Sequence, residues 1–79
     1  MRIDKFLKVS RILKRRTVAN EAARAGKVSV NGREVKPSYD VKVGDVVEIG
    51  FGEGAMKFRV ENIKETVRKD EVQSLYTVL

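Results

Sequence analysis

The stretch that decides the fold is MRIDKFLKVSRILKRRT, from Met1 to Thr17, and the rest of the chain is organised around it. Wound as a helix at about 100° per residue, its first part divides into two sides. One side carries Ile3, Phe6, Leu7 and Ser10. The other side carries Arg2, Lys5, Lys8 and Arg11. The start of the chain therefore predicts an amphipathic helix with a basic face.

This helix cannot continue in one piece through Leu13. Continuation would turn the apolar side chains of Val9 and Ile12 toward the basic side. A bend between Ser10 and Arg16 removes the conflict. The sequence therefore predicts a short helix, a basic corner and a second helix.

The second helix begins at this corner. Thr17 is the expected N-cap, because its hydroxyl can accept a hydrogen bond from a first-turn N–H, and Gly26 is the expected left-handed terminator. Arg15 and Arg16 would then lie beside the free N–H groups and the positive dipole end of this helix. A phosphate at the corner would meet both kinds of positive charge.

Beyond Gly26 the period of the sequence changes from helical to alternating. Residues 27–30 read as a strand, Asn31-Gly32 is a strong signal for a tight hairpin, and residues 33–35 begin the return strand. Pro37 ends this pairing because it has no N–H to donate. Further strands are expected over 46–49, 56–63 and 74–79, with turns at 44–45 and 51–54 and a loop or single helical turn over 64–73.

These elements predict an α+β fold in which two N-terminal helices pack on a small, mostly antiparallel sheet. Residues 1–79 form one domain, with a core motif over 1–50 and C-terminal strands within 55–79 that complete the sheet. The expected strand contribution to the core is Val28, Val30, Val35, Val41, Val47, Ile49, Phe58 and Val60. The expected helix contribution is Phe6, Leu7, Leu13 and Ala22.

Positive charge is confined to one part of the chain. The formal net charge is +6 and the sequence pI is about 9.9. Residues 1–36 hold eleven Lys or Arg and three acids, whereas residues 37–79 hold six basic and eight acidic side chains. A charge run is often no more than a solvated helix face, but this uneven distribution favours a surface that binds a polyanion such as nucleic acid.

The composition argues against an enzyme and against a metal site. The chain has no cysteine and no histidine, so a zinc site is effectively excluded, no cofactor is indicated, and no catalytic constellation is visible. Asp4 is expected to be a helix cap and Asp45 a turn residue. The apolar runs are too short for a membrane span and the start lacks the apolar core of a signal peptide, so we expect a cytoplasmic protein that does not enter the membrane.

Five spaced motifs resemble the RNA-binding domain named after the small-subunit ribosomal protein S-four. They are Arg2-x-Asp4-Lys5-Phe6-Leu7, Lys14-Arg15-Arg16-Thr17-x-Ala19, Gly26-x-Val28-x-Val30-Asn31-Gly32, Lys36-Pro37-Ser38 and Val43-Gly44-Asp45. The resemblance implies the αL-like fold of that family, with a concave basic surface for structured RNA. Over its whole length the chain is similar to the short, stand-alone members of the family that act in ribosome-associated quality control.

The resemblance also implies partners and contacts. A protein of this kind binds an obstructed large ribosomal subunit, touches 23S rRNA and the P-site peptidyl-tRNA, and assists a factor that adds C-terminal alanine tails. Away from the ribosome we expect a monomer. Arg2 and Arg16 would be the principal RNA contacts, because Arg binds phosphate bidentately and stacks on bases. The full set of candidate RNA-binding residues is Arg2, Lys5, Lys8, Arg11, Lys14, Arg15, Arg16, Arg24 and Lys36.

Other functions use the same features differently. A ribosome biogenesis factor or general binder of structured RNA would use the same basic face without needing peptidyl-tRNA. A protein-interaction adaptor would extend a partner's sheet with the final strand over 75–79, leaving the basic face merely solvated. DNA binding ranks last, because the helices lack an obvious set of base-reading side chains.

Overall fold

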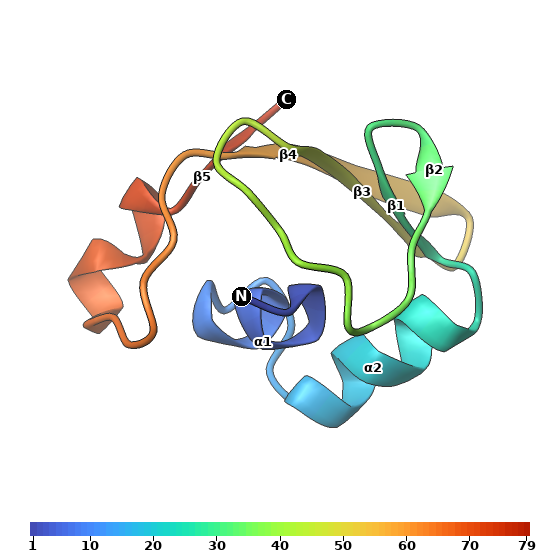
Figure 1. Ribbon diagram of the computed structural model, residues 1–79, viewed down its shortest axis with the longest axis horizontal. Coiled ribbons are helices and arrows are strands. Elements are labelled where there is room, and N and C mark those ends of the chain that lie inside the picture. Colours follow the sequence, from blue (N-terminus) through green and yellow to red (C-terminus); the bar gives the residue numbers. More distant parts are fainter.

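The computed structural model describes residues 1–79 as one antiparallel sheet with two helices packed on one face (Figure 1). The five strands have the order β2-β1-β3-β4-β5. In chain order the elements are α1 (Ile3–Val9), α2 (Arg16–Arg24), β1 (Val28–Val30), β2 (Arg33–Glu34), β3 (Val46–Phe51), β4 (Gly54–Val60), the 3₁₀ helix η1 (Lys69–Ser74) and β5 (Tyr76–Val78). The predicted α+β class and the packing of helices on a sheet are confirmed. No helix has the length and apolar character needed to cross a bilayer.

The corner between α1 and α2 lies where the sequence predicts a bend. Arg11 has a φ of +61°, which turns the chain away from the axis of α1, and the Leu13 N–H donates back to the Leu7 carbonyl at 3.0 Å. The prediction that Thr17 caps α2 is wrong. Arg15 is the cap residue, with extended backbone, and its carbonyl already accepts from the Ala19 N–H at 3.2 Å. The N-cap therefore lies two residues before Thr17, which is already inside the first turn of α2.

The end of α2 and the first hairpin follow their turn residues. Gly26 has a φ of +75° and its N–H donates to the Ala23 carbonyl, while the Lys27 N–H donates to the Ala22 carbonyl. This pair of bonds is a Schellman motif, so the predicted terminator is confirmed. Asn31 and Gly32 have φ values of +52° and +85°, the geometry of a type I′ turn between β1 and β2.

The later strands differ from the prediction only at their ends. β4 begins at Gly54 and ends at Val60, three residues before the predicted end, and β5 covers only Tyr76–Val78 of the predicted final strand. The stretch 64–73, predicted as a loop or a single helical turn, contains most of η1. Its Val72 is buried, which anchors this charged segment to the domain.

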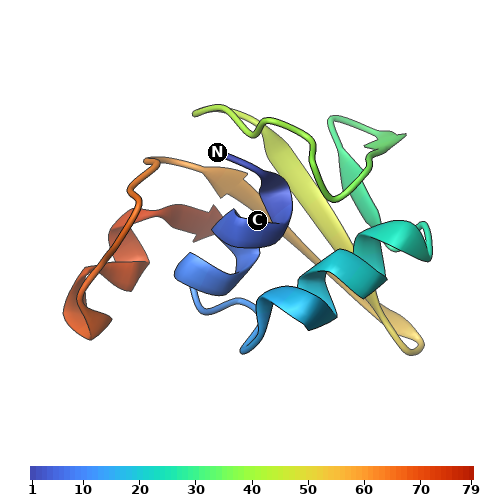
Figure 2. The same ribbon diagram turned by 60° about the horizontal axis from the view of Figure 1, so that its bottom comes forward.

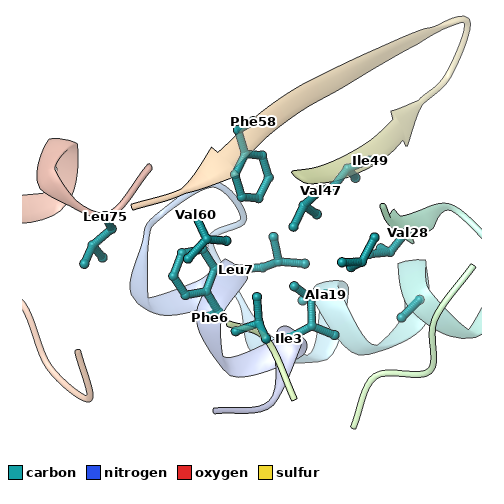
Figure 3. Packing of buried hydrophobic residues seen from close by; sticks show 13 residues of the cluster. Ile3, Phe6, Leu7, Ala19, Val28, Val47, Ile49, Phe58, Val60 and Leu75 are labelled. Atoms are coloured by element: carbon teal, nitrogen blue, oxygen red, sulfur yellow. The ribbon is translucent and has the colours of Figure 1, made fainter. Parts of the chain in front are cut away.

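The core lies between α1, α2 and the inner face of the sheet (Figure 3). The ring of Phe6 stacks on that of Phe58, with centroids 6.3 Å apart. Val35, Leu13 and Ala22 are only partly buried, contrary to prediction. The structure instead buries Ile3, Ala19, Ala23, Val72 and Leu75. The reason on α2 is rotational: Ala19 and Ala23 are four residues apart and share the face that meets the sheet, which leaves Ala22 at its margin.

The start of the chain is held in place by the segment after β2. The Ile3 N–H donates to the Tyr39 carbonyl at 2.8 Å, and the Val41 N–H donates to the Met1 carbonyl at 2.9 Å. Arg2 and Asp40 form an antiparallel bridge between these bonds. The first residues of α1 therefore lie beside the segment 36–41, although α2, β1 and β2 come between these two segments in the chain.

Candidate nucleic-acid interface

Two adjoining hollows form a concave surface where the start of α1, one side of α2 and the segment after β2 meet. Their volumes are about 520 and 380 Å³. Figure 2 shows the backbone of α1, of α2 and of the segment that follows β2. Arg2, Asn20 and Arg24 line both hollows, while Lys36 lines the larger and Arg16 the smaller. We call these five residues the concave basic surface. Four of them are predicted RNA contacts, which the fold gathers from three separate parts of the chain.

A buried carboxylate organises this surface. Asp4 is only 1% exposed, and its Oδ2 accepts hydrogen bonds from Arg2 Nη2 at 3.1 Å and from Asn20 Nδ2 at 3.2 Å. Its Oδ1 lies 3.4 Å from Arg16 Nε. The prediction that Asp4 caps the helix is wrong, because the N-cap is Arg2 and no side chain caps α1. Asp4 instead ties α1 to α2 and orients two arginines.

The two arginines keep most of their binding capacity. Their side chains are 48% exposed for Arg2 and 47% exposed for Arg16. A guanidinium has five N–H donors in a planar fork, so the contact with Asp4, a hydrogen bond from Arg2 and an ion pair with Arg16, leaves other donors of each side chain uncommitted. Asp4 therefore fixes part of each guanidinium group, and the remaining N–H donors of that group are available to a ligand.

The same contacts keep Asp4 ionised. Burial on its own would raise the pKa of Asp4, but the Asn20 amide, the Arg16 charge, the Lys5 backbone N–H and the Arg2 charge together hold it below the usual 3.8. Carboxylates that accept several hydrogen bonds beside cations commonly behave in this way. The contacts of the Asp4 carboxylate with Arg2, Arg16 and Asn20 are therefore intact at neutral pH.

This pKa shift predicts a loss of stability in acid. Because the folded pKa of Asp4 is lowered, its contribution is complete above the unfolded value of about 3.9 and is lost as pH falls through the folded value. We expect the free energy of unfolding to decrease as pH drops below about 4. Denaturation by urea at a series of pH values should show a shallower acid slope for Asp4→Asn than for the natural chain. Equal slopes would mean that the exposed carboxylates of Asp40, Glu61 and Glu65, whose pKa values are also lowered, account for the effect.

Arg24 and Lys36 differ from the two anchored arginines. Arg24 is the last residue of α2 and Lys36 precedes the Pro37 turn, and both side chains are exposed. Neither has a carboxylate within 4.0 Å. Their charges are not neutralised within the protein, so they are the cations of this surface that a phosphate can bind without breaking an existing contact.

Two residues that line these hollows, Asn20 and Glu34, are absent from the sequence prediction. Asn20 is recognisable only through its bond to Asp4, sixteen residues away in the chain. Glu34 lines the larger hollow, and its carboxylate lies so close to Gly26 that a Cβ there would be 3.2 Å from Oε2. A carboxylate in a basic hollow can accept a hydrogen bond from a ribose hydroxyl or a base amino group. No local pattern in the sequence marks either residue.

The remaining predicted RNA contacts lie elsewhere. Lys5 forms an ion pair with Glu65, so the C-terminal segment occupies it. Arg15 is exposed at the corner before α2. Three cations, Lys8, Arg11 and Lys14, line a separate hollow of about 590 Å³ beside residues 65–67. The nine predicted contacts therefore do not form one continuous site.

The chain is similar in sequence to known proteins. Residues 1–47 match the S4 domain family. The chain is 48% identical over its full length to the RQC P-site tRNA stabilizing factor of Bacillus subtilis, covering 92% of that protein, and 47% identical to the factor of the same name from Streptococcus pneumoniae, covering 90% of it.

A solved structure shows the same fold. Heat shock protein 15 of Vibrio cholerae, described as trimeric, superposes with a TM-score of 0.91 at 32% identity, with all of this chain and 81% of that chain covered. Both the sequence and the arrangement of helices on the sheet are thus similar to those of known proteins. The chain belongs to the S4 domain family and, within it, to the group of the RQC P-site tRNA stabilizing factors.

Proposed function

We propose that this protein binds structured RNA through the concave basic surface and stabilises peptidyl-tRNA in the P site of an obstructed large ribosomal subunit. The observation that carries the RNA contact is the presence of two unpaired cations, Arg24 and Lys36, beside two arginines oriented by Asp4. The full-length relatives named RQC P-site tRNA stabilizing factor support the choice of tRNA.

The shape of the surface favours backbone recognition. A-form RNA hides the edges of its bases in a deep, narrow groove, so proteins bind it mainly through phosphates and ribose hydroxyls. The concave basic surface offers guanidinium forks, one ammonium and the Asn20 amide, and the Glu34 carboxylate lines the larger hollow beside them. This set fits phosphates and hydroxyls and carries no evident code for a base sequence.

We extend the proposal to the wider role that the resemblance to the quality-control members of the S4 family implies. On the subunit the protein would contact 23S rRNA as well as the tRNA, and so act in the cytoplasm. By holding peptidyl-tRNA in place it would assist a quality-control factor that extends stalled chains with alanine. In this proposal the protein contributes binding and positioning and performs no chemistry of its own.

Retention of peptidyl-tRNA on isolated large subunits tests the proposal. We expect the half-life of bound peptidyl-tRNA to lengthen when the protein is added, and to remain short with Arg24→Ala/Lys36→Ala. An unchanged half-life with the natural chain would contradict tRNA stabilisation. A lengthened half-life with both proteins would instead show that stabilisation does not use the concave basic surface.

A further inference from the structure

We propose that the hollow beside the end of α1 is a second RNA site that binds an unpaired nucleotide. We call it the lateral hollow; its cations are Lys8, Arg11 and Lys14, and its aliphatic side chains are Val9, Leu13 and Val67. The inference rests on the proposed function in taking RNA as the ligand. It adds a second site that prefers an unpaired nucleotide, whereas the concave basic surface prefers structured RNA. In Figures 1 and 2 the C-terminal segment lies on one side of α1 and α2 lies on the other, so α1 separates the two sites.

The lateral hollow is positively charged. Lys8, Arg11 and Lys14 are exposed, and none of them has a carboxylate within 4.0 Å. The one acid in its wall, Glu65, is paired with Lys5. A phosphate at this site would therefore meet three free cations and one neutralised carboxylate, a balance that favours an anion.

The wall of the lateral hollow is unlike the concave basic surface. Val9, Leu13 and Val67 pack against the core with one side and are only partly buried, so each leaves some aliphatic surface in the hollow. An RNA helix keeps its bases stacked inside and would gain nothing from such a wall. An unpaired base can be splayed out and laid against apolar side chains or the plane of an arginine. The volume of about 590 Å³ lies in the range of sites for small ligands, roughly 300–1,000 Å³.

The backbone of Arg11 gives an independent reason to expect a functional side chain here. Its φ of +61° lies in the left-handed region, immediately after the residue that caps the end of α1. Glycine is the usual residue at such a position, because a side chain there is strained. Asn31, which has the other positive φ outside glycine, is a residue type that tolerates this geometry. An arginine kept in a strained conformation at the edge of a basic hollow indicates that its guanidinium is used for binding.

Binding of two simple RNAs by the full chain tests the second site. The probes are decauridylate, which cannot pair with itself, and a blunt twelve-base-pair RNA duplex, both followed by fluorescence anisotropy. For Arg11→Gly we expect a higher midpoint of thermal unfolding, because glycine adopts a positive φ without strain. We also expect a roughly tenfold loss of affinity for decauridylate, the effect of losing one charge-assisted hydrogen bond. The affinity for the duplex should change little. Val67→Ser should also weaken decauridylate binding, without changing its salt dependence, because it removes apolar surface and no charge.

A matched control separates site binding from general charge. Arg33→Gly removes the same charge on β2, outside both sites, and should leave the ratio of the two affinities unchanged. Three results would overturn the second site: no binding of decauridylate by the natural chain, equal losses for both RNAs in Arg11→Gly, or no effect of Val67→Ser. The proposed function fails separately, if the duplex still binds Arg24→Ala/Lys36→Ala with full affinity.

Discussion

Replacing Asp4 with asparagine is expected to weaken RNA binding although it makes the protein more positive. A gain of positive charge on an RNA-binding face ordinarily raises affinity. Asp4, however, is the buried partner of Arg2, Arg16 and Asn20. Without its charge the two guanidiniums lose their orientation, and each must be immobilised again when RNA binds, at about 0.5–1.5 kcal/mol per side chain. We expect a roughly tenfold loss of affinity.

The same substitution should also lower stability. Hydrogen bonds to a charged group contribute about 1.5–3 kcal/mol, and the loss of the Asp4 anion affects its contacts on both helices. We therefore expect a decrease of about 2 kcal/mol in the free energy of unfolding, measurable by urea denaturation. The affinity should be measured well below the unfolding midpoint, so that the two effects are separated.

Asp70→Asn is the matched control for this result. Asp70 is an exposed acid at the start of η1 with no ion pair, so its replacement adds the same charge outside the concave basic surface. It should leave affinity unchanged or slightly raised. If Asp4→Asn behaves like Asp70→Asn, Asp4 does not orient the arginines for binding.

Replacing Arg24 and Lys36 together with alanine is expected to abolish most RNA affinity while leaving the fold intact. Each is an exposed cation without an internal partner, so its removal should change stability by no more than about 0.5 kcal/mol. Two lost charge-assisted contacts at about 1.5 kcal/mol each correspond to a roughly hundredfold larger dissociation constant. The slope of log affinity against log salt should fall by roughly one unit per contact.

The control for the double variant is Arg33→Ala/Lys57→Ala. It has the same net charge, but both residues are exposed on strands β2 and β4 outside the concave basic surface. Anisotropy titrations with one structured RNA at several salt concentrations compare the two. Equal affinities for the two double variants would show that RNA responds to total charge and not to this surface.

Much of the fold could be predicted because its signals are local. Gly26 and Asn31-Gly32 carry positive φ values that few other residues adopt. The alternation of Val28 with Val30 in β1 and of Val47 with Ile49 in β3 identifies the inner face of these strands. The prediction for Thr17 failed because several adjacent residues can begin a helix. Choosing among them depends on where the corner before α2 ends.

The division of the basic residues into ion-paired and free side chains could not be predicted, because it depends on contacts between residues far apart in the chain. The pairing of Lys5 with Glu65 joins residues sixty positions apart, and Asp4 reaches Asn20 across the packing of α1 on α2. In the sequence Arg24 and Arg16 look alike, since both are basic residues of the second helix. Only the fold shows that Arg16 is tied to a buried carboxylate and that Arg24 is free.

Co-sedimentation with large ribosomal subunits tests the central claim most directly. Purified subunits with and without P-site peptidyl-tRNA are mixed with the natural chain or with Arg24→Ala/Lys36→Ala. We predict that the natural chain pellets with the tRNA-bearing subunits, that it does so far less with empty ones, and that the double variant stays in the supernatant in both cases. Equal pelleting on empty subunits, or undiminished pelleting of the double variant, would contradict an account in which the concave basic surface holds P-site tRNA.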